Sequence, residues 1–148
     1  MTTTVGTEKT VEKLVSNLLR LEHDAIAAYE ATIERLNDAT SRQQIEEFRH
    51  DHLDHVAQLE QFAARLEIDA PTGGDIKQML TAGKVALAGL AGDNAMIKAM
   101  KTNEDDTVKA YEQANANSLA DADMQPFVAS ALADEQRHRA WMETAVTK

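Results

Sequence analysis

The sequence predicts an all-α fold, an antiparallel four-helix bundle with a long crossover between helices 2 and 3. Aromatic residues make up only 4% of the 148 residues and there are two prolines, while residues that helices tolerate well dominate. Four stretches carry apolar residues at helical spacing, with turn-forming residues between them. A chain of this length that is 43% hydrophobic fits one domain, which we assign to residues 1–148.

The first two helices form a predicted hairpin. Thr7 is placed to cap a helix over about residues 7–37, whose leucines and alanines follow a near-heptad stripe. The polar run at 37–41 ends it, and Ser41 followed by Gln44 predicts a capping box that opens a helix over about 41–66. Because the turn is short, the two helices should be antiparallel.

Residues 67–92 form the predicted crossover, which Pro71 and five glycines interrupt. Within it we expect a short extra helix over about 75–90 that lies across the bundle or forms a dimer contact, since an exposed apolar patch favours association. A homo-oligomer, a dimer, is therefore expected.

The last two helices are predicted over about 93–117, capped by Asp93, and over about 124–146. Pro126 is acceptable in the first turn of the latter, where its missing N–H is not needed. Trp141 and most methionines should serve core or dimer packing; those methionines are Met79, Met96, Met100, Met124 and Met142.

The charge composition narrows the classes of partner. Lys and Arg number 15 against 25 Asp and Glu, a net charge of −10, which disfavours nucleic acid and anionic membranes as partners. Cysteine is absent, so a metal would be held by carboxylates and imidazoles. With no signal-peptide pattern at the start and no long apolar run, a cytoplasmic location is the simplest expectation.

Glu135 and His138 form the first candidate metal-binding pair. Residues three apart share one face of a helix, so both side chains could bind the same ion. Val128, Ala131 and Met142 lie at −7, −4 and +7 from Glu135, which puts the pair on the apolar stripe. A carboxylate that faces a core needs a partner.

An internal repeat adds two further carboxylates. Residues 21–30 align with residues 103–112 and match in register at Glu, Asp, Ala, Tyr and Glu. In both copies a glutamate on an apolar stripe is followed seven residues later by a tyrosine on the same face; these residues are Glu22 with Tyr29 and Glu104 with Tyr111.

The second helix offers two candidates for the counterpart of Glu135 and His138. Glu47 and His50 match Glu-x-x-His literally, but they share a polar face with Asp54. His52 and His55 lie instead on the apolar face of this helix. The repeat favours them too, since Tyr29 to His55 is 26 residues and Tyr111 to His138 is 27.

These residues resemble the ferritin-like superfamily of four-helix bundles, which includes ferritins, rubrerythrins and many small bacterial domains. That family places one Glu on each of two helices and Glu-x-x-His on each of the other two. The resemblance covers essentially the whole chain and implies a metal site, most simply two iron ions with dioxygen or peroxide chemistry. Its implied ligands are Glu22, His52, His55, Glu104, Glu135 and His138, with Tyr29 and Tyr111 orienting carboxylates behind them.

The sequence departs from the family pattern at His52, where the family has Glu. The extra imidazole moves the metal preference toward zinc, copper or a single iron, and manganese is also compatible. Asp51, Glu47 and His50 remain alternative ligands. The alternative function is a stress-associated or structural bundle whose site is vestigial or holds one metal ion; iron storage is a third, weaker interpretation.

Overall fold

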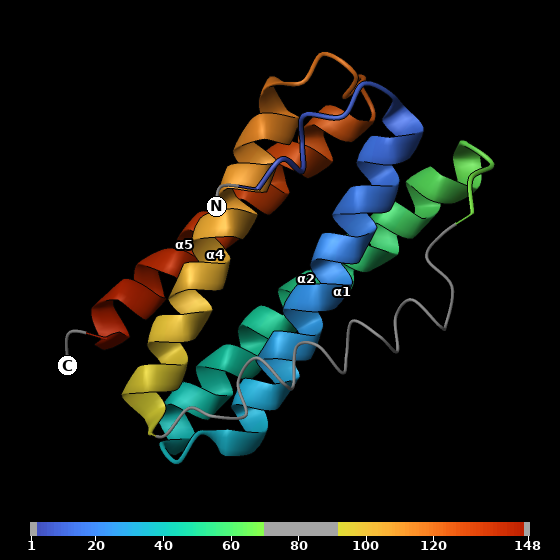
Figure 1. The fold of residues 1–148 in the computed structure, drawn as a ribbon. Helices are drawn as coiled ribbons and strands as arrows, with labels where there is room; N and C mark the ends of the chain where they lie inside the picture. The colour runs from blue at the N-terminus through green and yellow to red at the C-terminus, as the bar shows by residue number, and fades with distance from the viewer. Residues whose placement is uncertain (1–2, 70–91, 147–148) are drawn as a thin grey trace.

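The computed structural model describes residues 3–69 and 92–146, and within them the protein is an all-α four-helix bundle (Figure 1). The helices are α1 (Val11–Arg35), α2 (Ala39–Arg65), α4 (Asp93–Ala116) and α5 (Met124–Val146). The predicted architecture is thus confirmed at the level of four helices and a long connection between the second and the third. The predicted extra helix at 75–90 and its dimer contact lie outside the described residues.

The bundle consists of two antiparallel hairpins, α1 with α2 and α4 with α5 (Figure 1). The hairpins meet where α1 packs against α4 and where α2 packs against α5. Each helix therefore has two neighbours, and the four apolar faces enclose one interior.

The caps of α1 and α2 differ from the predicted ones. Helix α1 starts at Val11, after Thr10, whose hydroxyl accepts a hydrogen bond from the Lys13 backbone N–H at 3.3 Å. The predicted cap Thr7 belongs to a preceding turn. Helix α2 starts at Ala39 because Asp38 is the N-cap and accepts from the Ser41 N–H at 2.9 Å, which leaves Ser41 in the first turn.

Asp93 is not the N-cap of α4 that the sequence predicts. Gly92, with φ of 87°, is the N-cap of α4. The Asp93 carboxylate instead accepts the backbone N–H groups of Asn37 and Asp38, both at 2.9 Å, and so ties the start of α4 to the turn between α1 and α2. Helix α5 has the bounds that the sequence predicts.

The polar N-terminal segment, residues 3–10, lies against α4 (Figure 1). Gln113 donates to the Val5 carbonyl at 2.7 Å, and Asn117 donates to the Gly6 carbonyl at 2.9 Å. Gly6 has φ of +101° and its backbone touches α4, since an added Cβ would lie 2.4 Å from the Ala110 carbonyl oxygen. Only glycine combines this conformation with so close an approach.

Two clusters of buried apolar residues fill the interior. The first includes Leu14, Leu18, Val56, Leu59, Phe62, Phe127 and Val128. The second includes Ile45, Phe48, Met96, Ile97, Met100 and Met142. The methionines expected in packing are thus buried, except Met79, which lies outside the described residues. No described helix combines the length and apolar character needed to cross a membrane.

Replacing Gly6 by alanine should weaken the fold through the contact of the N-terminal segment with α4. The positive φ adds about 1–3 kcal/mol of strain for a residue with a Cβ, and the clash with α4 must also be relieved. We expect Gly6→Ala to lower the free energy of unfolding by about 2 kcal/mol or more in denaturant titrations.

Gly92→Ala is the matched control. Gly92 also has a positive φ, +87°, but no atom of the residues that the structure describes lies within 4 Å of an added Cβ, so the backbone strain is the expected effect. A loss of stability from Gly6→Ala no larger than that from Gly92→Ala would contradict the described contact with α4.

Candidate metal centre

A layer of charged side chains lies between the two apolar clusters. On every helix its members fall between residues of the first cluster and residues of the second. Helices α1 and α4 supply one glutamate each, and α2 and α5 supply two residues each, three apart on one face. The layer comprises Glu22, His52, His55, Glu104, Glu135 and His138, none of which is more than 2% exposed.

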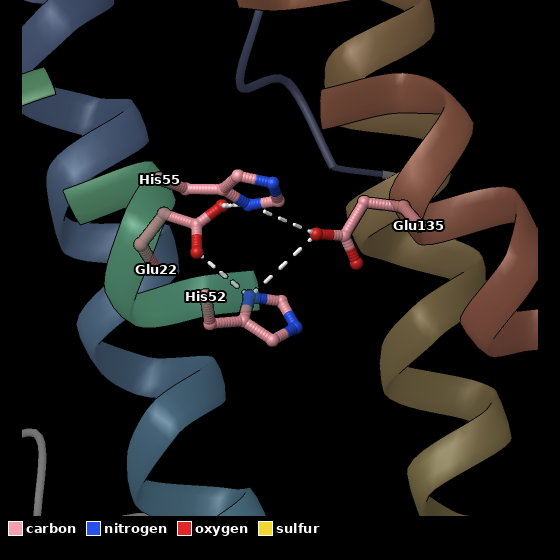
Figure 2. Close-up of side chains that lie close together, drawn as sticks. All are labelled: Glu22, His52, His55 and Glu135. Atoms are coloured by element: carbon pink, nitrogen blue, oxygen red, sulfur yellow. Dashed lines mark hydrogen bonds and ion pairs between the residues drawn. The ribbon is translucent and has the colours of Figure 1, made fainter. Parts of the chain in front are cut away.

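The first group of potential ligands is Glu22, His52, His55 and Glu135, each of which offers an atom within 4.8 Å of the others. Figure 2 shows Glu22 and the two histidines on one side of the group and Glu135 facing them from the other. Glu22 lies 2.7 Å from His52 Nδ1 and 3.1 Å from His55 Nδ1. Glu135 Oε1 lies 3.6 Å and 3.5 Å from the same two nitrogens.

The second group is His52, Glu104, Glu135 and His138, with the same close spacing. Glu104 Oε1 lies 3.7 Å from His52 Nε2 and 3.7 Å from His138 Nδ1. Glu135 Oε2 lies 3.4 Å from His138 Nδ1. The two groups therefore share His52 and Glu135, and the two oxygens of Glu135 face different groups.

The two tyrosines of the repeat bind the glutamates crosswise. Tyr29 on α1 donates its hydroxyl hydrogen to Glu104 on α4. Tyr111 on α4 donates to Glu22 on α1 at 2.6 Å. Burial and the nearby carboxylates raise the pKa of both phenols well above 10, so both remain donors. Each hairpin thus orients the carboxylate of the other.

Asp51 and Asp134 hold the outer nitrogens of two histidines. His55 Nε2 lies 2.8 Å from Asp134, and His138 Nε2 lies 2.8 Å from Asp51. A carboxylate at one ring nitrogen fixes the ring and leaves the other nitrogen free to bind a metal. Asp51, expected as a possible extra ligand, instead contacts the outer face of His138, and it belongs to neither ligand group.

The role of Asp134 was not predicted. The sequence does contain a signal for it, an Asp-x-x-x-His motif that occurs twice, as Asp51 with His55 and as Asp134 with His138. In the structure, however, each aspartate contacts the histidine of the other hairpin. The Arg137 side chain, which is more than half exposed, forms ion pairs with Asp51 at 2.8 Å and with Asp134 at 3.1 Å. It therefore links the two aspartates at the edge of the layer.

Glu47 and His50, the literal Glu-x-x-His pair of α2, are exposed. Neither is a member of a ligand group within the described part of the chain.

Burial and ion pairing have opposite effects on the pKa values of Glu22 and His52. Burial disfavours ionised Glu22, but its pairing with His52 and His55 outweighs burial and lowers its pKa to about 2. Burial likewise disfavours the His52 imidazolium, but Glu22 and Glu104 raise its pKa to about 10. Burial and the negative charge of Glu104 both raise the pKa of Glu135 well above its usual range. In the metal-free protein Glu135 therefore keeps its proton to a higher pH than an exposed glutamate does.

Several polar atoms of the layer have no hydrogen-bond partner. They are His52 Nε2, Glu104 Oε2 and both carboxylate oxygens of Glu135, and Arg49 Nε outside the layer is the other such atom among the described residues. An unsatisfied buried polar atom destabilises a fold by about 1–3 kcal/mol. Metal ions would satisfy all four atoms of the layer, and three carboxylates with three imidazoles are a donor set that suits divalent transition metals.

These shifts predict how the stability of the metal-free protein depends on pH. The contribution of His52 is fully present below pH 6.5 and is lost as the pH rises toward about 10. The contribution of Glu22 is fully present above pH 4.5 and is lost as the pH falls toward about 2. We expect the denaturant midpoint of chelator-treated protein to peak between pH 4.5 and 6.5 and to fall on both sides.

In the same titration His52→Gln should flatten the alkaline decline, whereas replacement of the exposed His50 by glutamine should preserve it. A wild-type midpoint that rises steadily from pH 6.5 to 10 would be incompatible with a His52 imidazolium held between carboxylates.

Comparison with known proteins identifies the family. Residues 9–117 match a family described as a domain of unknown function, DUF2383. The match spans α1, α2 and α4 and ends before α5, so Glu135 and His138 lie beyond it. No curated protein and no solved structure matches the chain. The match covers well over half of the sequence, and the chain therefore belongs to the DUF2383 domain family.

Proposed function

We propose that this protein is a metal-binding, ferritin-like four-helix bundle that holds two divalent ions in its buried polar layer. The observation that carries this proposal is the set of four buried atoms without partners, on His52, Glu104 and Glu135, within two overlapping groups of four potential ligands. An apolar interior rarely retains such atoms unless something binds them.

In this proposal five side chains of the layer and the two tyrosines have distinct tasks. Glu22 with His55 would hold one ion, and Glu104 with His138 would hold the other. Glu135 would contribute an oxygen to each site, because its two oxygens face different groups. Tyr29 and Tyr111 hold the outer glutamates in place by hydrogen bonds.

Iron is the expected metal, and zinc or manganese would also fit oxygen and imidazole ligands. The resemblance to ferritin-like bundles supports iron, since one glutamate comes from each of α1 and α4 and a pair spaced by three residues from each of α2 and α5. Bound iron would supply dioxygen- or peroxide-linked redox chemistry. The chain itself would exclude water from the site through its two apolar clusters.

A bundle without catalysis, whose polar layer serves structure alone, is the second candidate. The contacts of Glu22 favour it, since His52, His55 and Tyr111 satisfy this carboxylate without any metal. Glu135 has no comparable set of partners.

Metal analysis separates the two functions. Protein purified without added metal is reconstituted with iron, zinc or manganese, desalted, and analysed by mass spectrometry for metal. We expect about two ions per chain, one for each ligand group. Glu135→Ala should lose most of the metal because it removes a ligand of both groups, and His55→Ala should retain about one ion.

The double variant Glu47→Ala/His50→Ala is the matched control, because it removes the same residue types at the same spacing from the exposed face of α2. It should bind as much metal as the wild type. Near-zero metal in the wild type with all three ions would refute the metalloprotein and favour the structural bundle.

A further inference from the structure

The three histidines of the layer are of two kinds. His55 and His138 each present Nδ1 to the interior and have Nε2 fixed 2.8 Å from an aspartate. His52 has no such anchor, is 0% exposed, and directs both ring nitrogens into the layer. It is therefore the one histidine among these three whose two nitrogens are both available as ligands.

The two nitrogens of His52 lie in different groups. Nδ1 is 2.7 Å from Glu22 and 3.6 Å from Glu135 Oε1, both in the first group (Figure 2). Nε2 is 3.7 Å from Glu104 Oε1, in the second group, and has no hydrogen-bond partner. The Tyr29 ring, with its centroid 4.7 Å from that of His52, packs against the imidazole and holds this orientation.

The three glutamates of the ligand groups do not by themselves balance two divalent ions. Two divalent ions bring four positive charges, whereas Glu22, Glu104 and Glu135 bring three negative charges when all are ionised. Uncompensated charge in an interior is strongly unfavourable. An imidazole that binds a metal through each nitrogen carries no N–H proton and has one negative charge, which brings the charge of the ligand groups to −4. Asp51, Asp134 and Arg137 lie outside these groups and together add a charge of −1 at the edge of the layer.

We infer that His52 bridges the two metal ions as an imidazolate. This inference rests on the proposed function. Nδ1 binds the ion held by Glu22 and His55, and Nε2 binds the ion held by Glu104 and His138. Binding releases both ring protons of the His52 imidazolium to solvent, together with the proton that Glu135 carries when it is un-ionised, with no change of oxidation state. Glu135 spans the same two groups, so one ring and one carboxylate connect the ions.

Such a bridge selects among metals. Imidazole-rich sites suit zinc and copper more than all-carboxylate sites do. When His52 is an imidazolate, it has the same charge as the glutamate that the family has at this position, so the total charge of the ligands stays at −4. The difference is that this bridge between the ions is made by nitrogen atoms and not by oxygen atoms.

Nitrogen NMR of the zinc-loaded full-length protein tests the inference, because zinc is diamagnetic. The zinc content is measured first, and ¹⁵N–¹H correlations then report which ring nitrogens carry protons. We expect two zinc ions per chain, no ring N–H on His52, and metal-bound shifts for both of its nitrogens. His55 and His138 should each keep one N–H, at Nε2, and so serve as internal controls.

The signals are assigned from backbone correlations and from His52→Gln, with His50→Gln as the matched variant on the exposed face of α2. Backbone assignment suffices if His52→Gln does not fold. A ring N–H on His52 in protein with two bound zinc ions would overturn the bridge while leaving the metal site intact. Binding of a single zinc would overturn the bridge as well. Absence of zinc, iron and manganese binding would instead refute the proposed function itself.

Discussion

The burial of three carboxylates and three imidazoles between two apolar clusters is the constraint on which the rest of the structure depends. Removing such charges from water is unfavourable by several kcal/mol per ion unless they are paired in good geometry. The layer meets this requirement only in part. Glu22 has three hydrogen-bond partners, whereas neither oxygen of Glu135 has one, and burial together with the charge of Glu104 raises the pKa of Glu135. Because the buried carboxylates are only partly paired, a bound cation would account for the composition of the layer.

The contacts of the layer also hold the two hairpins together. Tyr29 with Glu104, Tyr111 with Glu22, His55 with Asp134 and His138 with Asp51 all join α1 or α2 to α4 or α5. These pairs are related by the internal repeat, so the two hairpins are alike in their chemistry as well as in their helices. The main departure from this likeness within the layer is His52, which occupies the position that Glu135 has in the other hairpin.

Periodicity was sufficient to predict the helices and to separate His52 and His55, which are buried, from Glu47 and His50, which are exposed. It works because the faces of long helices repeat regularly. The caps were harder to predict, since Thr7 and Thr10 both suit an N-cap and the choice between them depends on a turn within the N-terminal segment.

Contacts between distant segments could not be read from periodicity. Asp51 and Asp134 each lie four residues before a histidine of their own helix, yet each contacts a histidine of the other hairpin. The attachment of the segment 3–10 to α4 depends on Gly6, Gln113 and Asn117, which meet across more than a hundred residues. Such pairings follow from how the hairpins and the segment pack, which local pattern does not encode.

Anomalous X-ray diffraction from crystals of zinc- or iron-loaded protein tests the central claim most directly. The account predicts two anomalous peaks inside the bundle, one bordered by Glu22 and His55 and the other by Glu104 and His138, with His52 and Glu135 between them. Anomalous peaks confined to exposed acidic side chains, with none in the buried layer of fully loaded protein, would contradict it.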